Sequence, residues 1–204
     1  GDYVLSSTPM VYDIAALQHL YGPTSYNEGD TVYSYNPLVP FAEAIWDSGG
    51  MDTLAFDDFS TGLTISLKEG EYSTIPFEIE NPSDPNVVKN WAMTDNLGIA
   101  HGAFIENLIS GSGDDSITGN SLGNVIEGGL GNDTIKGGSG DDILDGGAGD
   151  DTIILESNDT FGSDLFAYNI STSLQAGTEE WINLAAKTRF GDVMDGGADV
   201  DTVE

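Results

Sequence analysis

The most regular feature of this sequence is a large apolar residue that recurs at every ninth position between residues 110 and 154. Each one lies in a short stretch between segments rich in glycine, aspartate and asparagine, which are turn-forming residues. The pattern predicts a series of short strands, each with one central side chain facing inward. The inward-facing residues are Ile117, Ile126, Ile135, Leu144 and Ile153.

Around these residues the sequence follows a register G-G-x-G-x-D-x-U-x, in which U is the apolar residue at position eight. Three nine-residue units match it fully, one nearly and one only in degenerate form: 128–136, 137–145 and 146–154, then 110–118, then 119–127. Glycine permits positive φ and close backbone approach, so carbonyl oxygens can turn inward. The period predicts an all-β stack of coils in which two units, each a turn and a strand, form one coil. A flexible glycine-rich linker would not repeat aspartate and isoleucine in this way.

The segment before the repeats has other patterns. Thr8 and Pro9 are suited to the start of a helix of about residues 8–21, and Gly22 and Pro23 end it. This helix is expected to dock on the rest of the molecule. Further along, residues 63–67 alternate as in a strand, and residues 46–54 fit the nine-residue register loosely.

We therefore divide the chain into a front half (1–109), the repeats (110–154) and a tail (155–204), and expect one compact all-β domain. The tail has enough apolar residues to cover the open end of a roll. It then returns to the register at 187–195 and 196–204, with Asp192 and Asp201 at position six. Because the pattern is still running at the last residue, we expect the chain to be part of a longer protein.

Composition adds a strong electrostatic constraint. Thirty-five acidic residues face five basic ones, which gives a net charge of −30. Disorder, a salt-adapted surface and binding of multivalent cations could each explain this charge. The aromatic content of 9% and the apolar patterning argue against disorder. Since the acids recur at fixed spacing, we favour cations. Without a basic patch, nucleic acid is excluded as a partner.

Calcium is the cation that this pattern favours. The aspartate at position six supplies a hard anionic oxygen, and Ca²⁺ prefers six to eight oxygen ligands. The chain has no cysteine, so neither disulfides nor thiolate metal sites can stabilise it. Several bound calcium ions could take that role. No apolar run is long enough for a membrane span.

Residues 110–154 resemble the RTX (repeats-in-toxin) family. The resemblance implies a parallel β-roll with calcium ions between turns on the same edge, held by carbonyls of positions one to four and by carboxylates of position six. Asn124 departs from the pattern, so the site that it shares with Asp142 is expected to be weaker. The aspartates at the variable position five are expected to be solvated: Asp114, Asp141 and Asp150. The implied ligands are Ser110, Gly111, Ser112, Gly113, Asp115, Asn124, Gly128, Gly129, Leu130, Gly131, Asp133, Gly137, Gly138, Gly140, Asp142, Gly147, Gly149 and Asp151.

A second resemblance covers about residues 8–154. The order TPM…DIAALQHLYG, GDTVYSY, IWDSGGMDTL and FIENLISGSGDD is similar to the C-terminal domain of serralysin-type metalloproteases. This resemblance implies two further calcium ions in the front half. The first would be held by carbonyls of Asn27, Gly29, Thr31 and Gly49 and by carboxylates of Asp47 and Asp52. The second would use Gly50, Asp52, the Phe104 carbonyl and Glu106.

The zinc motif of such a protease, H-E-x-x-H, does not occur in this chain. Its two histidines, His19 and His101, have no glutamate at the required spacing, so we expect no catalytic residues and no enzyme activity. No P-loop motif is present.

Three functions remain open at this stage. The first is a non-enzymatic, calcium-dependent adhesion module of a large secreted RTX protein at a bacterial surface, with a peptide or another surface ligand. Tyr33, Tyr35 and Trp91 are candidate contacts, although core packing also explains them. The second is the folding and secretion domain of a metalloprotease, and the third is a calcium-loaded spacer. In each, clustered acids favour type I export as an unfolded chain, followed by calcium-driven folding of a monomeric module.

Overall fold

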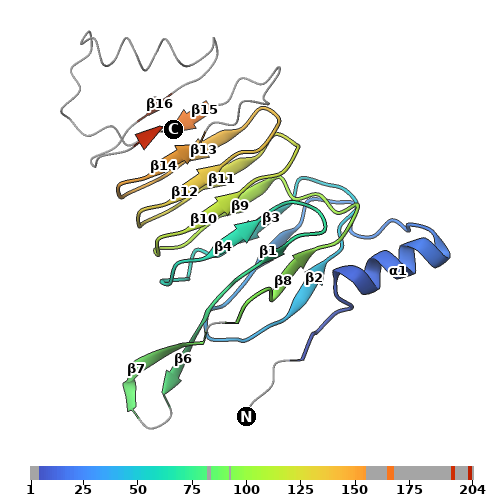
Figure 1. Cartoon of the computed structure of the whole chain (residues 1–204), viewed down its shortest axis with the longest axis horizontal. Coiled ribbons are helices and arrows are strands. Elements are labelled where there is room, and N and C mark those ends of the chain that lie inside the picture. Colours follow the sequence, from blue (N-terminus) through green and yellow to red (C-terminus); the bar gives the residue numbers. More distant parts are fainter. Residues whose placement is uncertain are drawn as a thin grey trace.

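A computed structural model describes residues 5–81, 84–91 and 93–154, together with short strands at 165–167, 194–195 and 202–203. Its main body is a parallel β-roll whose strands stack like rungs (Figure 1). One sheet has the order β1 (Val32–Ser34), β3 (Thr53–Ala55), β9 (Asn107–Ile109), β11 (Val125–Glu127), β13 (Ile143–Asp145), β15 (Leu165–Ala167) and β16 (Met194–Asp195). The facing sheet has the order β17 (Thr202–Val203), β14 (Thr152–Ile154), β12 (Thr134–Lys136), β10 (Ser116–Thr118) and β4 (Thr64–Ser66). The predicted all-β parallel roll is thus confirmed.

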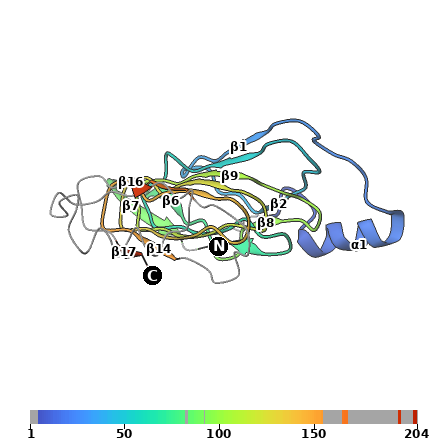
Figure 2. The ribbon, with the colours of Figure 1, turned by 90° about the horizontal axis from the view of Figure 1, so that it is seen from above.

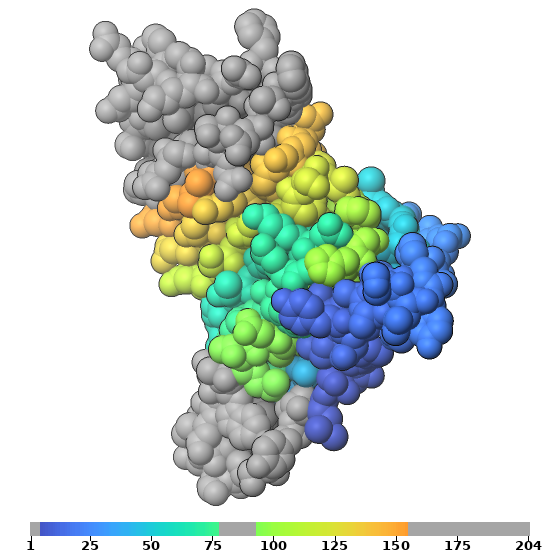
Figure 3. All heavy atoms as spheres, turned by 45° about the vertical axis from the view of Figure 1, so that its right-hand side comes forward, coloured from blue at the N-terminus to red at the C-terminus, as the bar shows by residue number. Residues whose placement is uncertain are grey.

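The register of the strands follows the nine-residue unit. Position eight always pairs with position eight, as in Ile117 with Ile135 and Ile126 with Leu144. All five residues at this position in the repeats are at most 1% exposed, so they form a continuous apolar column inside the roll. Viewed from above, successive coils lie over one another (Figure 2), and the space-filling view shows them as successive bands of colour (Figure 3).

The roll begins well before the obvious repeats. Strand β3 pairs with β9, which places Leu54 beside Leu108, and β4 pairs with β10, which places Ile65 beside Ile117. These residues are buried in the same core as the repeat column. The loose match to the register around Leu54 therefore marks a true coil of the roll, with inserted loops between its strands.

The front end carries two smaller sheets and most of the large core side chains. Strands β2 (Glu43–Ile45), β8 (Leu97–Ile99) and β5 (Tyr72–Ser73) form one sheet, and β6 (Phe77–Asn81) and β7 (Asp84–Trp91) form an antiparallel hairpin. Tyr35 stacks on Phe56, with ring centroids 5.3 Å apart, and Phe56 meets Phe59 edge-on. Tyr35 therefore belongs to the core, whereas the side chain of Trp91 lies outside the described part.

Helix α1 (Val11–Tyr21) docks on this front end through one face. Val11 and Ile14 are buried, and the backbone of Gly98 lies so close to Val11 and Tyr72 that a side chain there would clash. The helix begins at Val11 and not near Thr8, because the Thr8 hydroxyl accepts a hydrogen bond from the Ala44 N–H (2.8 Å) instead of capping the helix. None of the described helices has the length and hydropathy of a membrane span.

The stacked column predicts the response to a core truncation. Ile135→Ala would remove a fully buried side chain between Ile117 and Ile153 and should lower the free energy of unfolding by ~2–5 kcal/mol. Val125→Ala, on the outward face of β11 with 38% exposure, is the matched control and should change it by ~0.5 kcal/mol or less. Urea unfolding in saturating calcium measures both; equal losses would contradict the inward-facing column.

Candidate calcium sites

The position-six carboxylates form a ladder along one edge of the roll. The N–H of Leu63 donates to Asp115 Oδ1 at 2.7 Å, that of Asp115 to Asp133 Oδ1 at 2.8 Å, and that of Asp133 to Asp151 Oδ1 at 2.8 Å. Each carboxylate thus fastens its own turn to the turn before it. Asp115, Asp133 and Asp151 are all at most 3% exposed, so the ladder is internal. We call it the inner ladder.

The second oxygen of the Asp133 carboxylate takes no part in the inner ladder. Asp133 Oδ2 is buried and has no hydrogen-bond partner among the described residues. It lies against Gly128, where a Cβ atom would come within 2.5 Å of it, so glycine at position one leaves the space beside this oxygen open. A buried anionic oxygen without a partner is costly. The residues therefore fit a cation at this edge.

Burial also changes the proton affinity of the inner ladder. Desolvation raises the pKa of Asp133 to about 7, and the neighbouring Asp115 and Asp151 carboxylates add to the rise. Desolvation likewise raises the pKa of Asp115, although the Ser110 hydroxyl that donates to its Oδ2 acts in the opposite direction. Ser110 occupies a position-one site where the regular units have glycine, so the first turn partly satisfies its own carboxylate.

On the opposite edge of the roll, Asn124 stands at position six, where the regular units have aspartate. The Asn124 N–H donates to Asp142 Oδ1 at 2.8 Å, as in the inner ladder. Its side-chain amide, however, donates to the carbonyl oxygens of Ile105 and Glu106 (3.3 and 3.1 Å). Amide N–H groups thus face backbone oxygens that could otherwise face a cation. A weaker site at Asn124 and Asp142 remains our prediction.

The front half continues the ladder on this edge. The Thr31 N–H donates to Asp52 Oδ1, and the Asp52 N–H donates to Glu106 Oε2, both at 2.8 Å. Asp47 and Asp52 are fully buried, and Asp52 Oδ2 has no hydrogen-bond partner in the described part of the chain. Desolvation raises the pKa of Asp52 to about 6, with Asp47 and Glu106 contributing. We call Asp47, Asp52 and Glu106 the front carboxylates.

Two loops meet at the front carboxylates. The backbone of Gly50 contacts that of Gly29 so closely that a Cβ on Gly50 would overlap it, and Asn27 has a positive φ of 49°. The Tyr33 hydroxyl donates to Asp47 Oδ2 at 2.7 Å; burial and then this bond raise the pKa of Tyr33. The structure thus brings together the segments around Asn27–Thr31 and Asp47–Asp52 that the sequence predicted to share an ion.

Side chains alone do not complete a metal site. No group of three or more acidic or histidine side chains in the described residues is arranged to hold an ion. Backbone carbonyls would have to supply most ligands. The position-two carbonyls of Gly111, Gly129 and Asn120 each accept an N–H from the next turn on the same edge (2.8–3.0 Å), which keeps these turns in register.

A second ladder, at position five, was not expected from the sequence. The Asn132 N–H donates to Asp114 Oδ1 and the Asp150 N–H donates to Asn132 Oδ1, both at 2.8 Å; the Met51 N–H donates to Asp30 Oδ1 in the same way (2.9 Å). These exposed side chains fasten the following turn, whereas the inner ladder fastens the preceding one. We call this the outer ladder. The recurrence of Asp or Asn at position five was its only signal in the sequence.

Asp192 and Asp201 at position six fall outside the described residues, as do most of the apolar residues proposed to cover the end of the roll. Of the latter, Leu165 and Phe166 lie in β15, which continues the first sheet with Phe166 beside Leu144. Strands β16 and β17, which follow these two aspartates, do continue the two sheets in the predicted register, with Val203 beside Ile153.

The two ladders allow a matched test. Asp133→Asn and Asp114→Asn each remove one negative charge and retain a side-chain acceptor. Asp133→Asn removes a buried anionic oxygen and should weaken calcium binding at least about tenfold. Asp114→Asn acts at the exposed outer ladder and should change it less than about twofold. Calcium titrations followed by β-type circular dichroism measure both; equal effects would show that the inner ladder does not hold the ion.

The raised pKa values give a pH dependence with a defined sign. Asp133 (about 7) and Asp52 (about 6) exceed the ordinary value of 3.8, so their contribution to stability without calcium is present at low pH and is lost as pH rises through 6 to 7. In excess chelator, the module should be largely unfolded at pH about 8 and more folded at pH about 5. Calcium affinity should instead increase as pH rises from about 5 to about 8, because the ion binds the ionised carboxylates. Circular dichroism in chelator that does not change with pH would contradict this.

Comparison with known proteins agrees with this geometry. The family model of the RTX calcium-binding nonapeptide repeat matches residues 102–121 and 118–153. Metalloprotease AprA of Pseudomonas entomophila is 37% identical over 62% of this chain and 26% of its own length, and serralysin B of Dickeya chrysanthemi is 35% identical over 54% and 22%. Serralysin of Proteus mirabilis is 32% identical over 59% and 24%. The chain thus spans about a quarter of the length of the curated relatives that it matches. It carries RTX calcium-binding nonapeptide repeats, which fold as a β-roll and bind Ca²⁺, and it resembles the C-terminal domain of serralysins.

Proposed function

We propose that this chain is a non-enzymatic, calcium-dependent ligand-binding module of a secreted RTX protein at the bacterial surface, and that its ligand is an extended peptide. The observation that carries the proposal is the position of the front carboxylates beside an open strand edge. Strand β1 is the first strand of its sheet and pairs only with β3 in the described structure. An open edge is a template for an added strand.

The backbone of β1 is oriented for such an addition. The Thr31 carbonyl accepts from Thr53, and the Tyr35 N–H donates to Ala55, so residues 31, 33 and 35 face β3. In a parallel sheet, alternate residues direct both backbone groups to the same side. The backbone groups of Val32 and Ser34 therefore face the open edge. Val32, Met51 and Tyr26 have exposed fractions of 67%, 62% and 59% and offer apolar contacts near this edge.

The front carboxylates would define one end of the peptide site. We propose that the front carboxylates hold two ions, one at Asp47 and Asp52 and one at Asp52 and Glu106, each together with backbone carbonyls. The inner ladder would hold others in the repeats. Calcium bound at the front would supply positive charge on a strongly acidic molecule, where it attracts a carboxylate. Ser48, Gly50 and Met51 next to this site are exposed, which leaves access for a ligand.

The distribution of polar residues supports a role without catalysis. His19 lies in the last turn of α1 and His101 in the turn before β9, and both are exposed. The zinc motif is absent from the sequence. Since the buried carboxylates repel one another without a cation, millimolar calcium outside the cell would drive folding, whereas low calcium inside would leave the chain unfolded and ready for export.

A specific observation also favours the folding and secretion domain of a serralysin-type metalloprotease. The outward face of α1 exposes Tyr12, Leu20 and Tyr21 by 70–80%, an apolar surface that a preceding catalytic domain could cover. An H-E-x-x-H motif in the coding sequence upstream of Gly1 would decide for this function. A spacer without any ligand is the third possibility, and only the binding experiment below separates it from the first.

Peptide titration tests the proposal. Extended peptides with a free carboxyl terminus should bind in calcium and lose most of their affinity in chelator or when amidated. Val32→Asp, at the open edge, should weaken binding about tenfold or more, because it removes an apolar contact and adds negative charge. Val125→Asp, at the same outward position of the interior strand β11, is the matched control and should leave binding unchanged. Absence of calcium-dependent peptide binding across a random-sequence library would leave the spacer or the protease domain.

A further inference from the structure

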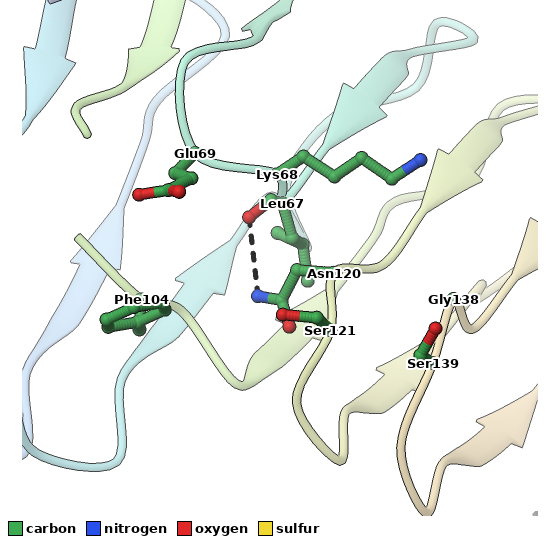
Figure 4. A pocket seen from close by; sticks show the side chains of 8 residues that line it. All are labelled: Leu67, Lys68, Glu69, Phe104, Asn120, Ser121, Gly138 and Ser139. Atoms are coloured by element: carbon green, nitrogen blue, oxygen red, sulfur yellow. Dashed lines mark hydrogen bonds between the residues drawn. The ribbon is translucent and has the colours of Figure 1, made fainter. Parts of the chain in front are cut away.

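A pocket of about 220 Å³ opens where an inserted loop meets two turns of the roll (Figure 4). The loop follows β4 and contributes Lys68 and Glu69; the turns contribute Ser121 and Ser139; and Phe104 comes from the turn before β9. Two lining residues, Phe104 and Gly138, are implied calcium ligands through the backbone, but neither the calcium sites nor the peptide proposal uses the side chains in this pocket.

Departures from the repeat pattern create the pocket. Phe104 stands at position four and Asn120 at position two, where regular units have glycine. The Asn120 side chain is 8% exposed and fully engaged: its amide donates to the carbonyls of Leu67 and Ile105 (3.3 and 2.7 Å), and its Oδ1 accepts the Leu122 N–H (2.9 Å). Asn120 therefore fastens the inserted loop to the roll and forms a rigid floor.

The loop is held at its other end as well. Glu69 Oε2 accepts the Gly102 N–H at 2.6 Å, and the Gly70 N–H donates to the Ile99 carbonyl at 2.7 Å. Gly70 also lies directly against the ring of His101, so no side chain fits at this position. Because both ends of the loop are hydrogen-bonded to the body, the pocket is preformed.

The walls combine one apolar face with several polar groups that are available to a ligand. Phe104 is 40% exposed. Within the described part of the chain, the Lys68 ammonium and the hydroxyls of Ser121 and Ser139 make no hydrogen bond to protein. Figure 4 shows Lys68 and Glu69 extending in opposite directions, Phe104 on the side of Glu69, and Ser121 between Phe104 and Ser139.

This combination matches a neutral sugar ring. A hexose presents C–H groups on one face, which pack against an aromatic ring, and hydroxyls around its rim, which both donate and accept hydrogen bonds. The net charge of −30 disfavours anionic ligands at most of the surface. A pocket of about 220 Å³ is smaller than the ~300 Å³ lower bound of drug-sized sites, so it accommodates one ring and not a long segment.

We propose that this pocket binds a single neutral hexose, as found at the end of a glycan chain. Phe104 packs against the ring, and Glu69, on the same side, offers its second carboxylate oxygen as an acceptor. The two serines bond hydroxyls of the ring, and Lys68, which extends to the other side, bonds a hydroxyl at the far end. The site is independent of the peptide edge, and either can exist without the other.

The test uses the calcium-saturated chain and a panel of methyl hexosides (glucoside, galactoside and mannoside), with binding followed by saturation-transfer NMR and by titration. At least one hexoside should bind. Phe104→Ala should weaken it about tenfold, since it removes the packing face but retains the backbone carbonyl. Lys68→Gln should weaken it several-fold, whereas Lys136→Gln, which removes a lysine outside the pocket, should not. Tyr12→Ala is the aromatic control on α1.

Several results would overturn the proposal. It fails if no hexoside binds, or if Phe104→Ala and Lys68→Gln leave binding unchanged while circular dichroism shows the calcium-bound fold. It also fails if the pocket variants lose only methyl glucuronide or a peptide with a free carboxylate, because the site would then be an anion site. If Phe104→Ala does not fold in calcium, Lys68→Gln and Ser121→Ala provide the same test without a change in the apolar wall.

Discussion

Each buried position-six carboxylate has two tasks, and they conflict unless a cation is present. One oxygen accepts the N–H of the preceding turn and thereby sets the spacing of the coils. The second, in Asp133, lies in the interior without a protein partner, and like charges lie one coil away on both sides. Hydrogen bonding and the apolar column favour the stack, whereas charge repulsion and desolvation oppose it. We expect calcium to shift this balance toward the folded state, so that binding and folding form one equilibrium.

The same principle unifies the two halves of the chain. Thr31, Asp52 and Glu106 occupy position six in coils that contain long insertions, and they make the same turn-to-turn bonds as the regular repeats. The front half is therefore a roll modified by loops, not a separate support for it. The loops carry what a regular roll lacks: an open edge at β1, exposed apolar residues, and a pocket at Phe104.

Much of this architecture could be predicted from the sequence because it rests on strict periodicity. Ile117, Ile126 and Ile135 specify strands, inward faces and register at once. The limits of prediction have physical causes. Thr8 looked like a helix cap, but a tertiary hydrogen bond to Ala44 takes its hydroxyl. Asp114 looked merely solvated, since a bond to the backbone of Asn132, 18 residues away, leaves no local signal. The pocket depends on Asn120, whose three hydrogen bonds reach segments that only the folded chain brings together.

The alternation of units between the two sheets imposes a parity rule on this molecule. Asp115, Asp133 and Asp151 share an edge because they are 18 residues apart, while the units between them face the other way. Duplicating two neighbouring units would add one coil and leave every later residue on its original side. Duplicating one unit would transfer every later strand to the opposite sheet and exchange the partners of each carboxylate. A change in length by two units therefore preserves the edge on which each later carboxylate lies, whereas a change by one unit exchanges the two edges.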